Sequence, residues 1–427
     1  MSVVQMAEWE TIWPYNNAAL RITLPDSAHN DVERLRKTNR LDILELRDGL
    51  RISANSFVGN VTIGDITVRI VPKIGPKSMP AFTRYALRLG QIDILDDSPI
   101  LLSSYGFVDL LGIVLRDEVD LLTRSGLTQD YQEVEEWTSL PRGSVRFSVL
   151  ARNPARAATA LPCRFQRRVT DIPLNRLAFA CLGSLRRSVS DYALAFDLQA
   201  REAMLSEVCI REPLTRSLLS EAVETLDRRT NYYQPVVNLA AFILAGLGIG
   251  FSGEVGAELP GFLFDMNILF ERFVSRLIQE YAPQSMVIDA QDTNSSAFRM
   301  TSNPHGWQRS RLRPDIVVRN ASGEPRIILD TKYKRFGAGV RPGSADIYQM
   351  TLYSVGFSRE KPVPARIIYP SDVKKVGETR LSFHAFEDQR GLGDIRILAL
   401  DIERCANALQ KRDESALREI VAELLAV

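Results

Sequence analysis

The segment Leu312-Arg313-Pro314-Asp315-Ile316-Val317-Val318 is followed, after a polar break, by Ile327-Ile328-Leu329-Asp330-Thr331-Lys332-Tyr333-Lys334. Both segments are apolar runs rich in β-branched residues, and the residues between them, Asn320 to Pro325, are typical of a turn. This pattern predicts two neighbouring strands joined as a hairpin.

Three charged side chains of this hairpin are expected to share one patch. Side chains alternate between the two faces of a strand, so Asp330 and Lys332 point to the same side and Thr331 points away. If the strands pair antiparallel, Asp315 comes close to Asp330, because one hairpin spans the 15 residues between them. Two adjacent carboxylates repel each other unless a cation lies between them, and Mg²⁺ is an oxygen-seeking ion that suits the place. With Lys332 orienting a water or stabilising charge on phosphorus, the set predicts phosphodiester hydrolysis.

Further residues elsewhere in the chain support a functional role for the motif Asp330-Thr331-Lys332. An Asp-x-Lys motif alone is usually a solvated surface pair, and this chain contains a second one, Asp372-Val373-Lys374. Here, however, a predicted helix follows in which Gln349 and Tyr353 lie one turn apart on one face. An upstream amphipathic helix over residues 264–274 carries Glu271 among aromatic residues.

This succession resembles the RecB-like branch of the PD-(D/E)xK nuclease superfamily. More narrowly, it resembles the McrC family, the nuclease subunits of McrBC modification-dependent restriction systems. Three segments carry that resemblance: Phe264 to Val274, Arg313 to Val317 and Leu329 to Lys334. Weaker matches at Ile70 to Ile74 and Asp171 to Arg176 extend the resemblance to the front half of the chain.

The resemblance implies a role for each motif residue. Asp315 and Asp330 would coordinate Mg²⁺, and Lys332 would act on the attacking water. Glu271 would complete the metal shell or support it from outside. Gln349 and Tyr353 would support the site.

The resemblance also implies a partner. Members of the McrC family bind a McrB-like AAA+ GTPase that recognises modified cytosine in double-stranded DNA, and their N-terminal portion stimulates its nucleotide hydrolysis. This chain contains no Gly-x-x-x-x-Gly-Lys-Ser/Thr phosphate loop, so nucleotide hydrolysis would be catalysed mainly by that partner.

The fold class predicted for the chain is multidomain α/β. Residues 1–150 are expected to form a β-rich, partner-binding domain with helices over 79–89 and 107–122. Residues 151–258 are expected to form a mainly helical connecting region. Residues 259–427 are expected to form a nuclease domain, a mixed sheet flanked by helices. Its predicted elements are a helix over 261–281, a strand over 286–288, the hairpin, a helix over 345–357 and a strand over 365–369.

The net charge of the chain is only +1, so any nucleic-acid surface must be local. Between residues 309 and 341 there are nine basic and three acidic residues, a balance of 9 − 3 = +6. Such a stretch suits a phosphate backbone. The DNA-binding candidates are Arg311, Arg313, Lys334 and Arg335.

A second basic stretch runs from residue 142 to residue 168, with seven arginines and no acidic residue. Its arginines are expected either to meet phosphates of DNA or of a partner's nucleotide, or to form a solvated face neutralised by acidic residues. The neutralising candidates are Glu133, Glu135 and Glu136. The partner-binding candidates are Lys73, Arg142 and Arg146.

Composition places the chain among ordinary globular proteins, with 45% hydrophobic and 25% charged residues. Its four cysteines and three histidines show no zinc spacing. The start of the sequence has no signal-peptide pattern, so a cytoplasmic protein is expected. The one membrane-like stretch, residues 236–251, is interrupted by Asn238 and three glycines, and is expected to be a buried helix rather than a membrane span.

Two other functions remain open at this point. One is a RecB-like nuclease that acts without a McrB-like partner, against which the long front half of the chain argues. The other is a non-catalytic activator subunit of an AAA+ motor, against which the complete motif set argues.

Overall fold

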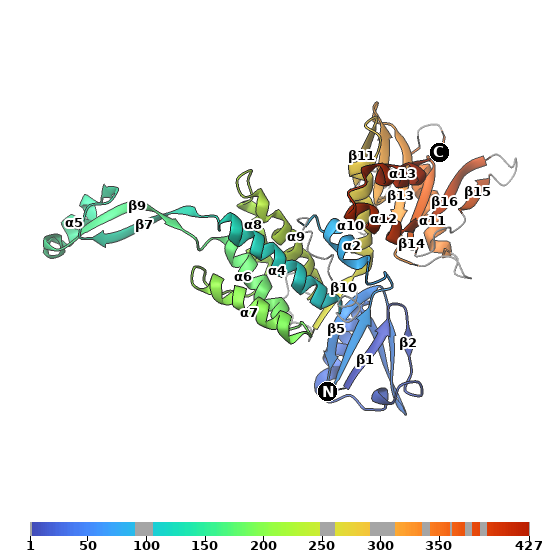
Figure 1. Cartoon of the computed structure of the whole chain (residues 1–427), viewed down its shortest axis with the longest axis horizontal. Helices are drawn as coiled ribbons and strands as arrows, with labels where there is room; N and C mark the ends of the chain where they lie inside the picture. The colour runs from blue at the N-terminus through green and yellow to red at the C-terminus, as the bar shows by residue number, and fades with distance from the viewer. Residues whose placement is uncertain are drawn as a thin grey trace, which may run out of the picture. The chain divides into compact units, whose positions relative to one another are not determined.

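A computed structural model describes residues 2–89, 106–247, 261–290, 312–334, 342–358, 361–371, 378–384 and 391–426. Contacts divide the chain into two compact units (Figure 1). Unit 1 comprises residues 1–107 together with 257–427, and unit 2 comprises residues 108–256. This division differs from the three consecutive domains predicted from sequence, because the two ends of the chain fold together.

The N-terminal part of unit 1 is built from two small sheets and a helix. The first sheet has the order β1-β6-β5-β10 and the second the order β2-β4-β3. Their strands are β1 (Ser2–Ala7), β2 (Thr11–Ile12), β3 (Leu41–Leu46), β4 (Gly49–Ala54), β5 (Phe57–Ile63), β6 (Ile66–Val71) and β10 (Gly261–Asp265). Helix α1 (Asp26–Lys37) contributes Leu35 to the core that the sheets enclose, and the short 3-10 helix η1 (Ala18–Leu20) contributes Leu20.

Strand β10 joins the two ends of the chain, because it pairs antiparallel with β5. The pairing depends on two glycines. A Cβ at Gly59 would lie 2.1 Å from the carbonyl oxygen of Phe262, and a Cβ at Gly261 would lie 2.2 Å from that of Asn60. Both glycines also have positive φ, 131° and 154°, which other residues rarely adopt. Residues 261–265, predicted as the first turn of a helix, therefore form a strand.

The helix that follows is α10 (Met266–Tyr281), capped by Asp265, whose side chain accepts a hydrogen bond from the backbone N–H of Asn267 at 2.9 Å. It leads into a six-stranded mixed sheet with the order β11-β12-β13-β14-β16-β15. The three adjacent strands β13, β14 and β16 run parallel, and the other pairs are antiparallel. The strands are β11 (Met286–Ala290), β12 (Ile316–Asn320), β13 (Pro325–Thr331), β14 (Ala365–Ser371), β15 (Thr379–His384) and β16 (Gly391–Asp401).

Helices cover both faces of this sheet. On one face, Met350 and Tyr353 of α11 (Ser344–Gly356) pack in one core with Ile328, Ala365 and Ile367. On the other face, Arg366 reaches the end of α13 (Glu414–Leu425). Helix α12 (Ile402–Gln410) follows β16, and α2 (Met79–Ala86) completes unit 1. The predicted mixed α/β character of the C-terminal third is confirmed.

Unit 2 is mainly helical and carries one long β-hairpin. Its helices are α4 (Phe107–Ser125), α5 (Phe147–Arg152), α6 (Pro173–Arg186), α7 (Tyr192–Ser206), α8 (Arg216–Glu224) and α9 (Gln234–Gly246), with the 3-10 helices η3 (Pro154–Ala158) and η4 (Asn231–Tyr233). The strands of the hairpin sheet are β7 (Asp130–Thr138), β8 (Ser144–Val145) and β9 (Leu161–Val169), in the order β7-β9-β8. The boundary predicted at residue 150 falls inside α5, within this hairpin. Helix α9 is largely buried, and no helix in the described ranges has the length and apolar character to cross a membrane.

Replacement of Arg366 by alanine is expected to destabilise unit 1. Its guanidinium is 0% exposed and donates to the carbonyl oxygens of Leu424 and Ala426. The variant leaves these carbonyls without their donor beside a cavity, which costs on the order of 3 kcal/mol. Thermal unfolding checks this, with Arg380→Ala as the control, because the Arg380 side chain is 60% exposed and its ion pair with Glu378 lies at the surface. Equal melting temperatures for the two variants would contradict the assignment.

Candidate functional site

The ends of β12 and β13 bring two carboxylates together. Ile316 pairs with Leu329 in the antiparallel register, and the same register places Asp315 opposite Asp330. The Asp315 carboxylate is held by Thr331, whose backbone N–H and hydroxyl both donate to Oδ2 at 2.7 Å. The hairpin therefore has the register that the sequence predicts, and the residue between Asp330 and Lys332 fixes the second carboxylate.

Asp330 is a buried acid next to a lysine. The residue is 1% exposed, and Nζ of Lys332 lies 2.6 Å from its Oδ2. Burial, together with the neighbouring negative charge of Asp315, raises the pKa of Asp330 to about 6, although Lys332 acts in the opposite direction. Burial alone would lower the pKa of Lys332, but the charge of Asp330 outweighs it and the pKa of Lys332 is raised. The pair therefore holds a tightly bound proton on the lysine and a carboxylate that ionises with difficulty.

Helix α11 anchors the lysine and the loop before Asp315. Nζ of Lys332 donates to Oε1 of Gln349 at 3.3 Å, and Nε2 of Gln349 donates to the hydroxyl of Tyr353 at 2.8 Å. That hydroxyl in turn donates to the carbonyl oxygen of Arg313 at 2.9 Å. One chain of hydrogen bonds thus connects the strand end, the helix and the segment that carries Asp315.

Asp346 also belongs to this cluster, although the sequence reasoning missed it. It is 7% exposed, it lies in the first turn of α11, and its Oδ2 is 3.2 Å from Nζ of Lys334. Its negative charge contributes to the raised pKa of Asp330. The helical spacing from Asp346 to Gln349 and Tyr353, three and seven residues, is the signal that would have identified it.

Glu271 stays a predicted member of this cluster. It lies at a half-buried position of α10, and Phe270 is the residue of that helix whose ring meets Tyr333, with centroids 5.9 Å apart. Within the described parts of the chain, no three or more His, Cys, Asp or Glu side chains are grouped closely enough to hold a metal ion. The structure therefore places Asp315 and Asp330 together but gives no support for Glu271 as a third ligand.

The two carboxylates fit a magnesium ion on chemical grounds. Mg²⁺ takes oxygen ligands, commonly one or two carboxylates, and completes its shell with water and substrate phosphate. A cation between Asp315 and Asp330 would also offset the repulsion that contributes to the raised pKa of Asp330. Asp315 and Asp330 are the residues that would hold the ion.

The predicted DNA-binding residues lie near this cluster where they are described. Arg313 and Lys334 are exposed residues on either side of it, whereas Arg311 and Arg335 lie outside the described residues. The second motif of the same type, Asp372-Val373-Lys374, also lies outside them.

Three of the seven arginines of the basic stretch in unit 2 are paired with glutamates of its own hairpin. Arg164 and Arg167 of β9 form ion pairs with Glu133 and Glu136 of β7. Arg146, the residue after β8, forms an ion pair with Glu135 of β7. Arg142 lies over the ring of Phe165, 5.9 Å from its centroid. The three glutamates expected to neutralise this stretch are thus paired with three of its arginines, and contact of the remaining arginines with phosphates stays a prediction.

The family model described as "McrBC 5-methylcytosine restriction system component" matches residues 52–370, about three quarters of the chain. The chain belongs to the McrBC family. The resemblance predicted from the motifs is thereby confirmed at the level of the family. No curated protein matches the sequence.

Two solved structures resemble this McrBC family member. One is described as a refined half-complex from the tetradecameric assembly of Thermococcus gammatolerans McrB AAA+ hexamers with bound McrC. A chain of that structure has a TM-score of 0.63 and 16% identity, over 99% of this chain and 100% of that chain. A chain of the cryo-EM structure of the Thermococcus gammatolerans McrBC complex has a TM-score of 0.48 and 16% identity, over 66% of this chain and 89% of that chain. The first likeness shows that the fold is shared over the whole chain.

The raised pKa of Asp330 predicts a pH-dependent cost to the stability of this McrBC family member. Because the folded-state value of about 6 lies above the ordinary value of 3.8, the folded protein holds this proton more tightly than the unfolded chain does. The proton on Asp330 therefore contributes to the free energy of unfolding below about pH 4, and this contribution is lost as the pH rises through 6. Asp330→Asn has no such proton, so its stability relative to wild type should increase by about 2–3 kcal/mol between pH 4 and pH 7.

Unfolding in the presence of a chelator, followed across this pH range, checks that expectation. The matched control is Asp289→Asn, because Asp289 is a more exposed strand aspartate of the same sheet that pairs with Arg319 at 2.6 Å. Parallel pH profiles for wild type and Asp330→Asn would show that the carboxylate ionises without cost.

Proposed function

We propose that this chain is the Mg²⁺-dependent DNA endonuclease subunit of a McrBC-type restriction system. It would cleave DNA that contains methylcytosine when an AAA+ GTPase partner, whose hydrolysis it stimulates, activates it. The observation that carries the proposal is the cluster of Asp315, Asp330 and Lys332 at the strand ends, with Gln349 and Tyr353 behind it. This combination on a mixed sheet flanked by helices is that of the PD-(D/E)xK nucleases the sequence resembles.

The residues of the cluster divide the chemistry between them. Asp315 and Asp330 would hold the metal ion, which when bound polarises a phosphodiester and lowers the pKa of a coordinated water. Lys332 lies beside Asp330 with its ammonium fixed by Gln349. From there it can orient the attacking water or stabilise the negative charge that develops on the phosphoryl oxygens. Tyr353 keeps the backbone before Asp315 in place, so both carboxylates remain in register.

Cleavage of methylated plasmid DNA tests the nuclease proposal. Wild type should cut methylated DNA, but not unmethylated DNA, in the presence of Mg²⁺, GTP and the cognate AAA+ protein. Asp330→Asn and Lys332→Ala should each reduce the rate by roughly 10³-fold, because each removes a group that acts on the reacting atoms. Asp289→Asn is again the control and should cut at the wild-type rate.

Three results would favour other functions. Cleavage by wild type without the partner would favour an independent RecB-like nuclease. Equal restriction by wild type and Asp330→Asn would favour a non-catalytic activator. A melting temperature of wild type that does not rise with Ca²⁺ or Mg²⁺ would argue against the metal site itself.

The hairpin of unit 2 is the part proposed to contact the AAA+ partner. Within its unit it extends away from the helices (Figure 1). Its end exposes two large apolar side chains, Leu140 at 72% and Phe147 at 73%. Exposed apolar residues at the end of a hairpin are suited to insertion into a partner's surface. Glu135 and Glu133 of β7 form ion pairs with Arg146 and Arg164, and we assign these pairs to stiffening the hairpin. The exposed apolar residues at the end of the hairpin are assigned to binding the partner.

Replacement of Phe147 by aspartate should weaken binding of the AAA+ partner by at least about 30-fold, the effect expected for an anchoring aromatic side chain. Isothermal titration with the purified partner and a non-hydrolysable GTP analogue measures it. Phe196 on α7 is equally exposed, at 73%, and Phe196→Asp supplies the matched control. Equal losses in the two variants would remove the hairpin tip from the interface.

A further inference from the structure

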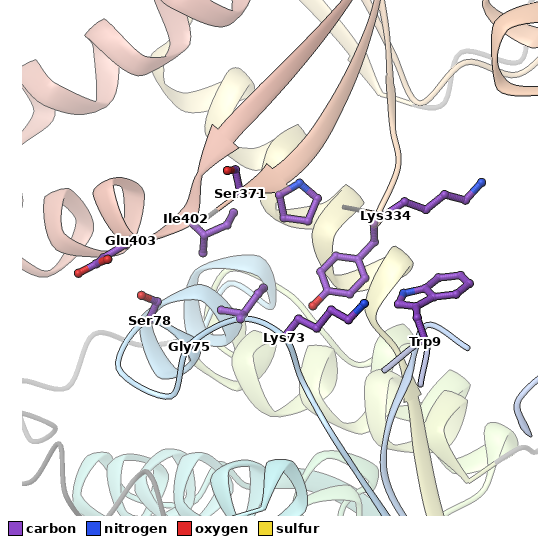
Figure 2. Close-up of a pocket in the computed structure, with 11 residues that line it drawn as sticks. Trp9, Lys73, Gly75, Ser78, Lys334, Ser371, Ile402 and Glu403 are labelled. Atoms are coloured by element: carbon purple, nitrogen blue, oxygen red, sulfur yellow. The ribbon is translucent and has the colours of Figure 1, made fainter. Parts of the chain in front are cut away.

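A cavity of about 140 Å³ is connected to the carboxylate cluster through one of its lining residues, Lys334, whose Nζ lies 3.2 Å from Oδ2 of Asp346. It is lined by Tyr333 and Lys334, the two residues that directly follow Lys332, and by Trp9 and Lys73 of the N-terminal part (Figure 2). A cavity of about 150 Å³ accepts a benzene ring, so this one has room for a single six-membered ring. The wall is mixed rather than apolar, because Ser78 and Ser371 also line it.

Trp9 has an unusual backbone conformation at the mouth of this cavity. Its φ is +61°, in the left-handed region, which costs a residue other than glycine about 1–2 kcal/mol. Its side chain remains 41% exposed, so packing does not fully offset that cost. Strain of this kind persists where a side chain must be presented in one direction, commonly at a binding site.

Glu8 fixes Trp9 relative to the nuclease cluster. The residue is 1% exposed, and its Oε1 accepts hydrogen bonds from the backbone N–H of Lys73 at 2.7 Å and from the hydroxyl of Tyr333 at 3.0 Å. It therefore ties the ends of β1 and β6 to the residue after Lys332. Trp9, the next residue after Glu8, is thus held at a set position beside the strand that carries Asp330.

The charges around the cavity suit an anionic ligand that carries a ring. The side chain of Lys73 extends toward Trp9, and the carboxylate of Glu403, the one acidic lining residue, points away from them (Figure 2). Lys334 also lines the cavity with a 44% exposed side chain, but its ammonium is paired with Asp346, so Lys73 is the cation assigned to the ligand. An aromatic face beside an ammonium group is the arrangement by which proteins bind nucleotides of single strands, the ring stacking on the base and the ammonium meeting the phosphate.

We propose that this cavity is a subsite for one nucleotide of the DNA strand next to the phosphate that is cut, with Trp9 stacking on its base and Lys73 binding its phosphate. The inference rests on the proposed nuclease function and adds a substrate contact from the N-terminal part of the chain. It explains why the strained Trp9 and the buried Glu8 lie where the two ends of the chain meet.

Binding of a fluorescein-labelled single strand of roughly 15 nucleotides to the full-length chain, with Ca²⁺ in place of Mg²⁺, tests the subsite. Trp9→Gly should bind about 5- to 100-fold more weakly, the range for loss of one base–aromatic stack. Glycine adopts positive φ without strain, which offsets part of the packing lost with the indole, so this variant should keep its fold. Tyr15→Ala is the control, because Tyr15 is exposed in the same part of the chain and should leave the affinity unchanged.

Two further variants separate stacking from a general loss of binding. Stacking quenches indole emission, so the strand should quench the wild type more than Trp9→Phe, which should keep most of the affinity because it retains a ring. Lys73→Ala should lower the slope of log affinity against log salt by about 0.7, the value for one phosphate contact to a single strand. Retention of the full slope would remove Lys73 from the phosphate contact.

Wild-type affinity in Trp9→Gly would overturn the proposal, whether or not the wild type cuts DNA. Equal quenching by free deoxycytidine monophosphate at the concentration that suffices for the strand would overturn it in favour of a free-nucleotide site. Failure of the nuclease proposal has a different signature: wild type and partner would not cleave methylated DNA, while the binding of the strand would still depend on Trp9.

Discussion

Asp330 is a carboxylate at 1% exposure whose Oδ2 lies 2.6 Å from the ammonium of Lys332, at the end of the central parallel strands. Much of the C-terminal sheet is arranged around this ion pair. An isolated buried charge would be prohibitively costly, so its neighbours must supply compensating contacts. They do so in two layers: Lys332 meets the carboxylate, and Gln349 of α11 holds the lysine. Tyr353 of the same helix binds the backbone before Asp315, so the helix that stabilises the lysine also sets the register of the second acid.

The N-terminal part of the chain is connected to this arrangement by backbone geometry as well as by side chains. Strand β10 completes the N-terminal sheet and leads directly into α10, the helix whose Phe270 meets Tyr333. Glu8 reaches the same tyrosine from β1. Tyr333 therefore contacts both Glu8 and Phe270, which are more than 250 residues apart in the sequence. Through Tyr333, the position of β13 depends on the correct folding of both chain ends, which form one unit.

The parts of this structure that the sequence predicted are those that local patterns determine. The hairpin of Asp315 and Asp330 follows from alternation over 15 residues, and α11 from helical spacing of Gln349 and Tyr353. The pairing of β10 with β5 was beyond such reasoning, because it depends on two glycines far apart in the sequence, each of which leaves room for a carbonyl of the opposite strand. The place of Glu271 beside the carboxylates was inferred from a family resemblance and stays a prediction, because the pattern of a helix does not fix its rotation about its own axis. The ion pairs of three hairpin arginines, Arg146, Arg164 and Arg167, with glutamates of β7 depend on how the strands pair, which the sequence alone does not show.

The cost of the carboxylate cluster bears on which function the chain performs. A buried acid with its pKa raised to about 6 opposes folding at neutral pH, and asparagine has nearly the same shape without that cost. A subunit that only activated a motor would gain stability from such a replacement and lose nothing. The strained Trp9 is a second, independent cost, directly after the Glu8 that binds Tyr333, and glycine would relieve the backbone strain. A buried carboxylate and a strained tryptophan both lower the stability of the fold. Such residues are expected at a functional site, because binding and catalysis need charged groups and aromatic rings that are already in position before the substrate binds.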